Sequence, residues 1–406
     1  MSKSRRYLTA QEAAQELNIT VATLYAYVSR GLIRSESGNG RNRARLYHSE
    51  DVARLRQRKQ YRRNPDKVAE QALQAGSPIL ESAITLITDD CLYYRGQNAL
   101  ELAVQTGIEA VAELIWTGTL EKSASIQDTL VLSPRCQAII PHLHDLKPIE
   151  RMQAILPIAA ADDLAAYNRH PQAVAQTGRR ILQLMTLVAT GQTEIEGDIA
   201  QTLQQSWVPQ DTTAKILINA ALILCADHEL NASAFTARCA ASTEANPYGV
   251  VIAGLAALQG HKHGTASEQV EIFFREMEAA TSIRRGLVDR LKRGEQIPGY
   301  GHLIYRDVDP RASVLNQLMA THYPLHPAVK RTQEIVQEAN QLVNMRQNVD
   351  FMLATLARVL QLPPGGAPAL FALGRTIGWL GHAIEQYGLG QIIRPRAKYV
   401  GKLPPV

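Results

Sequence analysis

Cysteine is scarce in this sequence. It holds four cysteines in 406 residues, and no two of them stand in a C-x-x-C spacing. That absence excludes the common paired-cysteine zinc and redox motifs. We expect reduced, mostly buried thiols, as in a cytosolic protein. The four are Cys91, Cys136, Cys225 and Cys239.

Long apolar runs are also missing. The longest, residues 216–226, contains Asn219 and stops at Asp227, so no segment reaches membrane-spanning length. The N-terminus lacks the apolar core of a secretory signal. With 46% hydrophobic and 20% charged residues, the composition is typical of a soluble globular protein. We therefore expect a cytoplasmic protein with no membrane partner.

Aromatic residues make up only 5% of the chain, which leaves Ala, Leu, Ile and Val to fill the core. These residues suit close-packed helices, and their 3.6-residue spacing beyond residue 68 predicts a mainly α fold. Expected helices span 98–116, 151–166, 172–190, 213–226, 233–259, 266–292, 327–345, 350–361 and 368–387. Strand signals are confined to Ile87–Asp90, Leu92–Arg95 and Gln391–Arg394.

Several well-known catalytic motifs are absent. There is no G-x-x-x-x-G-K-[ST] phosphate loop, no G-x-S-x-G elbow and no H-E-x-x-H zinc pair. Gly299-Tyr300-Gly301 is too short for a dinucleotide fingerprint. His261 and His263 form an H-x-H pair with no acid or thiol nearby in the sequence, which is a weak metal signal. We expect no bound metal and no resident cofactor.

What the chain does have is an uneven charge. Residues 1–67 carry 15 Lys or Arg against 6 Asp or Glu, a net charge of +9. The remainder carries 28 against 32, a net charge of −4. The basic excess points to a polyanion partner for the N-terminal module alone. Asn64-Pro65 marks the boundary, so we expect one domain at 1–63 and another at 68–406.

The N-terminal module reads as two helices joined by a short turn. The first helix lies within TAQEAAQELNI, and Thr20 is placed to cap the second, VATLYAYVSRG. A loop rich in Gly, Asn and Arg follows from Ser35 to Arg45. The residues expected inside are Ala13, Ala14, Leu17, Val21, Leu24 and Val28.

This stretch, with the following RLYHSEDVARLRQRK, resembles the winged helix-turn-helix of the MerR and excisionase families. The resemblance implies that the second helix enters a DNA major groove while a basic wing follows the phosphates. The implied DNA-binding residues are Thr23, Tyr25 and Arg30 on the helix, and Arg41, Arg43 and Arg45 on the wing. The alternative is an old DNA-binding fold kept as a docking or regulatory piece.

Four stretches of the larger domain combine His or Asp with Gly, Pro or Asn, where backbone can approach a ligand. They are DHELNAS (227–233), GHKHG (260–264), IPGYGHLIYRDVDPR (297–311) and NVD (348–350). Arginines recur through the same half of the chain. A pocket built from these parts would hold acid–base groups for neutral pH and arginine forks for carboxylates.

The chain from about 85 to 400 resembles citrate synthase. The strings that carry the resemblance are YRGQNALELA, ELIWTGTL, ADHELNASAFTARCAASTEANPYGVVIAGLAALQGHKHG, IPGYGHLIYRDVDPRA, NVDFMLATL, FALGRTIGWLGHAIEQ and IIRPRAKYVG. The implied fold is a large helical domain with a smaller lid at about 265–360. The implied reaction joins acetyl-CoA, a substrate rather than a cofactor, to oxaloacetate and water, giving citrate and CoA.

The resemblance also implies residue roles. Asp350 would remove a proton from the acetyl methyl group, His263 would stabilise the enolate, and His302 would polarise the keto carbonyl of oxaloacetate. His228, Arg311 and Arg375 would hold the oxaloacetate carboxylates, with Arg394 reaching in from the second subunit of a homodimer. Gly299, Gly301 and Arg306 would lie near CoA.

Departures from the family pattern fall in one loop. The family usually has Gly-Pro-x-His-Gly-Gly-Ala-Asn, whereas residues 260–267 read GHKHGTAS, and Leu303 follows His302 where Arg or Ala is common. Two alternatives therefore stay open. One is 2-methylcitrate synthase, which uses propionyl-CoA and differs by a single methyl group. The other is a DNA-binding regulator whose synthase-derived domain senses a ligand.

Overall fold

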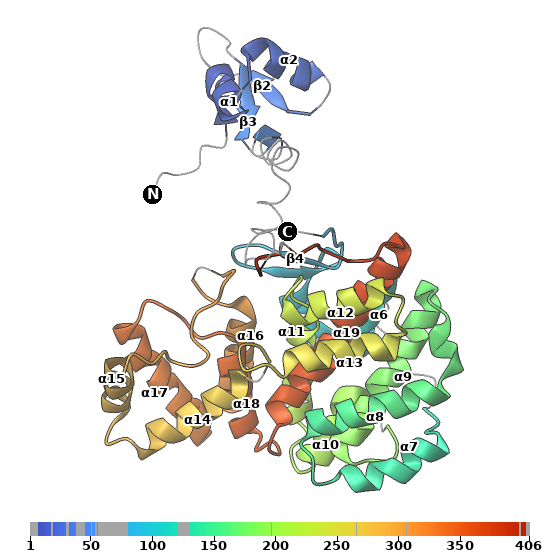
Figure 1. Ribbon diagram of the computed structural model, residues 1–406. Coiled ribbons are helices and arrows are strands. Elements are labelled where there is room, and N and C mark those ends of the chain that lie inside the picture. Colours follow the sequence, from blue (N-terminus) through green and yellow to red (C-terminus); the bar gives the residue numbers. More distant parts are fainter. Residues whose placement is uncertain are drawn as a thin grey trace. The chain divides into compact units, whose positions relative to one another are not determined.

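The computed structural model divides between Glu81 and Ser82 into two compact units (Figure 1). It describes residues 7–17, 19–29, 32–37, 45–49, 51–52, 55, 80–120, 130–195, 197–264, 266–305, 307–397 and 399–402. Each unit has its own hydrophobic core. In the described part of the chain, no helix combines the length and apolar character needed to cross a bilayer.

The smaller unit packs two short helices on a three-stranded antiparallel sheet of order β1-β3-β2. Its elements are β1 (Tyr7–Leu8), α1 (Ala10–Leu17), α2 (Val21–Ser29), β2 (Ser35–Ser37) and β3 (Arg45–His48). Thr20 caps α2 as predicted, because its Oγ1 accepts from the Thr23 backbone N–H at 3.2 Å. The core of this unit consists of Leu8, Ala13, Leu17, Leu24, Ile33, Tyr47 and Val52.

For this unit, the predicted loop is wrong at both of its ends. The predicted loop over 35–45 begins and ends in strands, since Ser35 pairs with Tyr47 and Ser37 with Arg45. Polar residues form the outer strand here, so the apolar alternation that announces a strand is missing. Residues 38–44, with Arg41 and Arg43, lie outside the described residues, as does Arg30.

The larger unit is a helical assembly with one small antiparallel sheet, of order β4-β5-β6. Its strands are β4 (Thr85–Ile87), β5 (Leu92–Tyr94) and β6 (Gln97–Asn98). Its helices are α5 (Ala99–Gln105), α6 (Ile108–Thr117), α7 (Pro134–Ile139), α8 (Pro148–Asp162), α9 (Pro171–Thr190), α10 (Ile199–Trp207), α11 (Ala214–Cys225), α12 (Ala232–Ser242), α13 (Pro247–Leu258), α14 (Ala266–Ala279), α15 (Ile283–Lys292), α16 (Pro310–His322), α17 (Pro327–Leu342), α18 (Val349–Val359) and α19 (Gly366–Leu389). Two 3-10 turns, η1 (Ile140–Leu143) and η2 (Leu164–Tyr167), complete it.

Three predicted helices are each two helices. Gly107 separates α5 from α6 inside 98–116. Asn246 caps α13 ahead of Pro247, which ends the expected continuity of 233–259. Ser282 caps α15 and divides 266–292. Periodicity continued across each break because the flanking helices bury faces in the same core.

The strand predictions were partly wrong. Near the first predicted strand, Ile87–Asp90, the structure has β4 (Thr85–Ile87), so only Ile87 of the prediction belongs to a strand. Gln391–Arg394 forms no strand: the Gln386 side chain donates to Gln391 O at 2.7 Å, and the Ile393 N–H donates to Ser242 Oγ at 3.0 Å. The backbone of this segment therefore bonds to the side chains of two helices and not to another strand.

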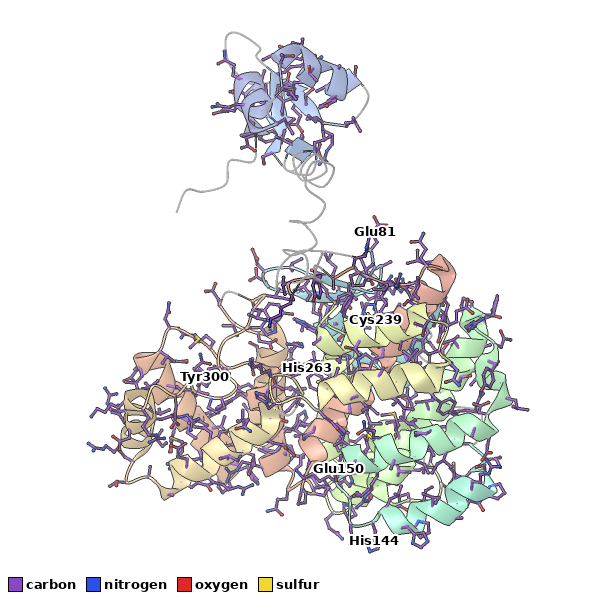
Figure 2. All side chains as sticks on the ribbon, in the orientation of Figure 1. Glu81, His144, Glu150, Cys239, His263 and Tyr300 are labelled. Carbon is purple, nitrogen blue, oxygen red and sulfur yellow. The ribbon has the colours of Figure 1, made fainter. Side chains whose placement is uncertain are left out.

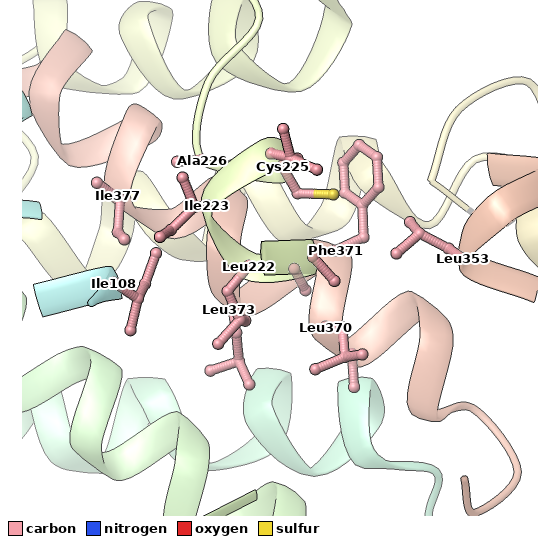
Figure 3. Close-up of a cluster of buried hydrophobic side chains, with 14 of the residues drawn as sticks. Ile108, Leu222, Ile223, Cys225, Ala226, Leu353, Leu370, Phe371, Leu373 and Ile377 are labelled. Carbon is pink, nitrogen blue, oxygen red and sulfur yellow. The ribbon is translucent and has the colours of Figure 1, made fainter. Parts of the chain in front are cut away.

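Helix α19 lies at the centre of the larger unit and is buried along most of its length. It contacts α11, α12 and α13, and α9 and α6 as well (Figure 1). A Cβ on Gly374 would collide with the backbone oxygen of Leu222, and the Gly378 N–H donates to Ala226 O at 3.0 Å. Glycine thus lets α19 and the end of α11 touch backbone to backbone. Figure 3 shows the apolar side chains around this crossing.

Helices α14 to α18 form a group of their own, seen in orange tones in Figure 1. Within the group, α18 contacts α14, α16 and α17. The group meets the other helices where α16 contacts α11 and where α18 and α14 contact α19. The segments before α12, before α14, before α16 and at the start of α18 meet at this junction, and together with α19, which carries Arg375, they hold most of the predicted site residues.

Candidate active site

Two glycines shape the loop that carries His302. Gly299 and Gly301 have φ values of +73° and +85°, a region that favours glycine. Asn348 ties this loop to α18: its backbone N–H donates to Gly299 O at 2.8 Å and its Nδ2 donates to Gly301 O at 3.0 Å. Its Oδ1 accepts from the Asp350 backbone N–H at 3.0 Å. One side chain therefore fixes both the loop and the first turn of α18.

The ring of His302 is held in one tautomer. Its Nδ1 accepts from the backbone N–H groups of Ile304, at 3.0 Å, and Tyr305, at 3.3 Å. A ring nitrogen that accepts carries no proton, so the neutral ring has its hydrogen on Nε2. Burial, followed by the charge of Arg311, lowers the pKa of His302 to about 4. At pH 7 the ring is therefore neutral and presents an N–H donor at Nε2.

Arg311 is buried and pairs with Asp309 at the start of α16. Its Nε donates to Oδ1 at 3.0 Å and its Nη2 to Oδ2 at 2.8 Å. Asp309 Oδ2 also accepts from the Val349 backbone N–H at 3.0 Å, which links α16 to α18. Arg311 Nη2 lies 3.5 Å from His302 Nε2. Two N–H groups that face each other in this way suit an oxygen that accepts from both.

His228 follows α11 and lies against the same loop. Its ring stands edge-on to that of His302, with centroids 5.1 Å apart, and its Nε2 lies 3.1 Å from the Tyr305 hydroxyl. Burial, together with Arg311 and Arg375, lowers the pKa of His228 well below its usual value. The imidazole is thus a neutral polar group between two guanidinium ions.

Arg375 is buried in the middle of α19. Its Nε donates to Cys225 O at 2.8 Å, and its guanidinium lies over the Phe371 ring at 4.9 Å. Among the described residues its terminal nitrogens form no hydrogen bond, which leaves them for an anion. Figure 3 shows Cys225 and Phe371 within the same buried cluster.

Asp350 lies in the first turn of α18. Its Oδ1 is shielded from solvent, and no described residue donates a hydrogen bond to it. Burial raises the pKa of Asp350 to about 6, even though Arg311 and Arg375 act in the opposite direction. A carboxylate in this state is ionised at pH 7 and more basic than an ordinary aspartate, as a general base requires.

His263 lies in the turn between α13 and α14. Its Nε2 is 2.8 Å from Ser233 Oγ, and that oxygen accepts from Trp379 Nε1 at 3.2 Å. Burial, followed by Arg375, lowers the pKa of His263 to about 4, so this ring is neutral at pH 7. Figure 2 shows His263 where the α14–α18 group meets the other helices, with Tyr300 inside that group.

The structure brings most of the predicted residues together. His228, His302 and Arg311 are in direct contact, and Arg375 and Asp350 are within electrostatic reach of Arg311. Phe371 connects His263 to this group, because it contacts the His263 ring edge-on at 6.2 Å and Arg375 through its face. Three neutral imidazoles, two guanidinium ions and one unpaired carboxylate therefore lie where the α14–α18 group meets the other helices.

One predicted residue is not part of this cluster. Arg394 is exposed in the segment after α19 and has no hydrogen bond to the described site residues. Arg306 lies outside the described residues. A cavity of about 110 Å³ opens beside His302 and is lined in part by Asp307 and Arg346. Among the described residues, no group of three or more His, Cys, Asp or Glu is arranged to hold a metal ion.

Several site residues escaped the sequence analysis. Asp309 stood in the quoted string DVDPR, and an Asp directly before a Pro is a helix-capping signal that could have singled it out. Tyr305 and Ser233 carried no such signal, since their roles depend on contacts with residues far away in the chain. Asn348 was quoted only as a neighbour of Asp350.

Three of the predicted DNA-binding residues lie in the described part of the N-terminal unit. The Tyr25 side chain is 54% exposed on α2, and Arg45 is exposed on β3. Thr23 is half-buried, and its hydroxyl lies 2.9 Å from Thr20 Oγ1. Exposed tyrosine and arginine side chains are groups that contact a nucleic-acid backbone.

The family model described as "Citrate synthase, C-terminal domain" matches residues 72–396. The chain belongs to the citrate synthase family. The model described as "MerR HTH family regulatory protein" matches residues 8–64, so the N-terminal domain is a MerR-family helix-turn-helix. A citrate synthase of Synechocystis sp. is 30% identical over 356 residues, which cover 80% of this chain and 90% of that protein. The chain is accordingly an acyltransferase of the class that converts acyl groups into alkyl groups on transfer.

Other members of the citrate synthase family extend this likeness. A 2-methylcitrate synthase of Shewanella oneidensis is 34% identical over 194 residues, covering 46% of this chain and 51% of that protein. The crystal structure of the Thermotoga maritima citrate synthase superposes with a TM-score of 0.70 at 26% identity, covering 82% of this chain and 96% of that one. A Thermoplasma acidophilum citrate synthase in complex with carboxymethyl coenzyme A and oxaloacetate shares the fold, with a TM-score of 0.71 at 22% identity over 83% of this chain and 97% of that one.

Proposed function

We propose that the chain condenses acetyl-CoA with oxaloacetate and water to give citrate and CoA. The observation that carries this proposal is Asp350, a buried carboxylate with an unpaired Oδ1 and a pKa near 6 at the meeting point of neutral histidines and buried arginines. A weak carbon acid needs a base of this kind and a donor for the enolate oxygen.

In the proposed first step, Asp350 removes a proton from the methyl group of the thioester. His263 donates a hydrogen bond to the carbonyl oxygen as negative charge develops there. The neutral ring suits this role, because an imidazole N–H stabilises an enolate without a full proton transfer. In this proposal Ser233 Oγ donates to His263 Nε2 across their 2.8 Å contact, so the hydrogen of the neutral ring is on Nδ1 and the donor is oriented before the substrate arrives.

In the proposed second step, the enolate carbon attacks the keto carbon of oxaloacetate. The keto oxygen accepts hydrogen bonds from His302 Nε2 and from Arg311, whose Nη2 lies 3.5 Å from that nitrogen. Arg375, whose terminal nitrogens form no hydrogen bond among the described residues, binds a carboxylate, and His228 assists. Arg394 of the second subunit completes the site in the homodimer that the sequence predicts. We also propose that the enzyme acts in the cytoplasm.

Hydrolysis of the condensed thioester must wait until the carbon–carbon bond has formed. We assign that timing to closure of the lid, about 265–360, which contains the α14–α18 group. Gly299 and Gly301, with Arg306, are placed in the proposal near CoA. The Thermoplasma acidophilum enzyme, which shares the fold, is described in its structure as a complex with carboxymethyl coenzyme A and oxaloacetate.

A CoA-release assay tests the proposal and separates its two enzyme versions. Oxaloacetate is supplied with acetyl-CoA or propionyl-CoA, and free thiol is followed with a chromogenic disulfide. A higher kcat/KM with acetyl-CoA supports citrate synthase, whereas a preference for propionyl-CoA supports 2-methylcitrate synthase, the activity named for the Shewanella oneidensis relative. Release without oxaloacetate would mean simple thioester hydrolysis, and no release with either would overturn both versions.

A second function rests on a separate observation, the MerR-family domain at residues 8–64. We infer that this domain binds DNA through α2, with Tyr25 and Arg45 on the exposed side. If the acyl-CoA assay stays negative while oxaloacetate or an acyl-CoA changes DNA affinity, the larger domain is a ligand sensor. If turnover is high and neither ligand changes DNA affinity, the two domains act separately.

A further inference from the structure

Tyr305 contacts three residues of the proposed oxaloacetate site. It lies between His302 and α16 and is only 4% exposed. Its ring meets the His302 ring at 4.7 Å and the His228 ring at 5.5 Å, and the Arg311 guanidinium lies over it at 5.8 Å. Three groups that are proposed to hold one substrate therefore share this tyrosine as a common surface.

The hydroxyl of Tyr305 adds a polar contact to this packing. It lies 3.1 Å from His228 Nε2, and no other described side chain hydrogen-bonds the His228 ring. Burial raises the pKa of Tyr305 to about 12, so the hydroxyl keeps its hydrogen at every working pH. The hydrogen bond is thus present throughout the range in which the enzyme acts.

The geometry of the three rings shows what this contact controls. The His228 ring stands at 73° to the His302 ring and at 70° to the Tyr305 ring, so it packs edge to face with both. His302 is already fixed by two backbone donors, and Arg311 is fixed by Asp309. Among the described residues, the Tyr305 hydroxyl is the side-chain hydrogen-bond partner that helps to fix how the His228 ring is turned about its Cβ–Cγ bond.

We propose that Tyr305 is a positioning residue for the 2-oxo acid substrate, which acts by holding the His228 imidazole in its binding orientation. The inference rests on the proposed function, because it assumes that His228 contacts oxaloacetate. It assigns Tyr305 no contact with the reacting carbons. Its removal should weaken oxaloacetate binding and leave the acyl-CoA side of the site unchanged.

The variant that tests this is Tyr305→Phe, which keeps the ring and removes only the hydroxyl. The expected result is an oxaloacetate KM about tenfold higher, an acetyl-CoA KM within about twofold of the parent, and a small change in kcat. Tyr323→Phe is the matched control, because it also loses one hydroxyl, bonded to Asp211 Oδ2 at 2.7 Å, away from the site. The control should keep both KM values. An unchanged oxaloacetate KM in Tyr305→Phe would overturn the inference.

A double-mutant cycle shows whether the hydroxyl acts through His228. Oxaloacetate affinity is measured by calorimetry, independently of turnover, for the parent, Tyr305→Phe, His228→Asn and the double variant. If Tyr305 acts through His228, adding Tyr305→Phe to His228→Asn changes affinity by less than about twofold. A full tenfold loss in that background would mean that the hydroxyl acts without His228, which overturns the inference.

Failure of the proposed function gives a different pattern. A folded parent that binds no oxaloacetate and releases no CoA contradicts the function and the inference together. An active parent whose oxaloacetate affinity equals that of Tyr305→Phe contradicts the inference alone. Thermal unfolding of every variant, followed by circular dichroism, confirms that the compared chains are folded.

Discussion

His382 and Asp227 face each other in the interior, with Nε2 3.3 Å from Oδ1 and no exposed surface on either side chain. Asp227 also accepts from Thr85 Oγ1 at 2.5 Å and from the Glu229 backbone N–H at 3.1 Å. These contacts tie α19, β4 and the segment after α11 together. Because Asp227 directly precedes His228, the pair fixes the backbone on which a proposed substrate ligand stands.

The first prediction concerns the stability that this buried carboxylate provides. Burial would raise the pKa of Asp227, but His382, Arg375 and the Thr85 hydrogen bond outweigh it and hold the pKa below its usual value. A lowered folded-state pKa stabilises the fold above the pKa of the unfolded chain, near 4, and the stabilisation disappears as the pH falls through the folded value. Asp227→Asn should lower the free energy of unfolding by about 3 kcal/mol at pH 7.

Urea unfolding of Asp227→Asn and the parent at pH 7 and at pH 3 measures this. The difference between them should shrink at the lower pH, because Asp227 of the unfolded parent is then protonated and the stability that its lowered pKa provides is being lost. Asp289→Asn is the control: it pairs with Arg285 on the surface and should change stability by less than about 0.5 kcal/mol. An equal effect of Asp227→Asn at both pH values would contradict the charge argument.

The second prediction concerns the proposed base. Asp350→Asn keeps the shape of the side chain and removes its basicity, so turnover should fall on the order of a hundredfold or more. Oxaloacetate affinity, measured by calorimetry, should stay within a few-fold of the parent. Asp162→Asn, which loses a carboxylate paired with Arg135 far along the chain, should keep full turnover. Near-full turnover of Asp350→Asn with every acyl-CoA that the parent accepts would show that the mechanism is wrong.

The third prediction is a pH profile. With its pKa near 6, Asp350 becomes protonated and inactive as the pH falls, so kcat/KM for acetyl-CoA should rise from pH 5 to 7 and level off above. The midpoint should lie near pH 6. His302 and His263, with pKa values near 4, stay neutral over this range and should add no second step. A rate that stays level down to pH 5 would exclude a base with this pKa.

The general architecture and the types of residue in the site could be predicted from the sequence. The hydrogen-bond and ion-pair partners of those residues could not. Amphipathic spacing predicted α9, α11 and α19 nearly to their ends, because each buries a continuous face. The pKa of Asp350 could not be predicted, since it depends on how α16 and α19 enclose it. Likewise Ser233 and His263 lie 30 residues apart, and only the packing of α12 against α13 brings them into contact.

Two helix ends were missed although the sequence contains the residues that signal them. Asn246-Pro247 and Ser282 are ordinary N-cap signals, yet the apolar spacing on both sides made 233–259 and 266–292 look continuous. Capping satisfies backbone N–H groups that an unbroken helix would satisfy internally, so both solutions fit the same apolar pattern. A careful count of capping residues would have divided both segments correctly.

The fourth prediction concerns the homodimer. If Arg394 serves the neighbouring site, Arg394→Ala subunits and Asp350→Asn subunits are each inactive alone, but one site of a mixed dimer contains both intact residues. Mixing the two after partial unfolding should therefore restore activity to about one site per mixed dimer. Arg396→Ala mixed with Asp350→Asn provides a comparison with a neighbouring exposed arginine. If mixed dimers form and no activity returns, Arg394 does not complete the partner's site.

The last prediction concerns DNA. Residues 1–67 carry a net charge of +9, and a homodimer would present two MerR-family domains. Lys and Arg release counterions from phosphates, so binding of duplex DNA should be tight at low salt and weaken steeply as salt rises. Two linked domains bind one duplex far better than one does, so the preferred site should be a pseudo-palindrome.

Electrophoretic mobility shifts with labelled genomic fragments measure this on the full chain, on Tyr25→Ala with Arg45→Ala, and on a chain that starts at Ser82. The full chain should shift duplex DNA at low salt, the double variant should bind more weakly, and the shortened chain should not bind. Acetyl-CoA turnover should survive in all three, because every proposed catalytic residue lies beyond residue 200. Equal DNA binding by the full and shortened chains would refute the DNA-reading role. Loss of turnover in a folded shortened dimer would instead make the N-terminal domain part of the enzyme.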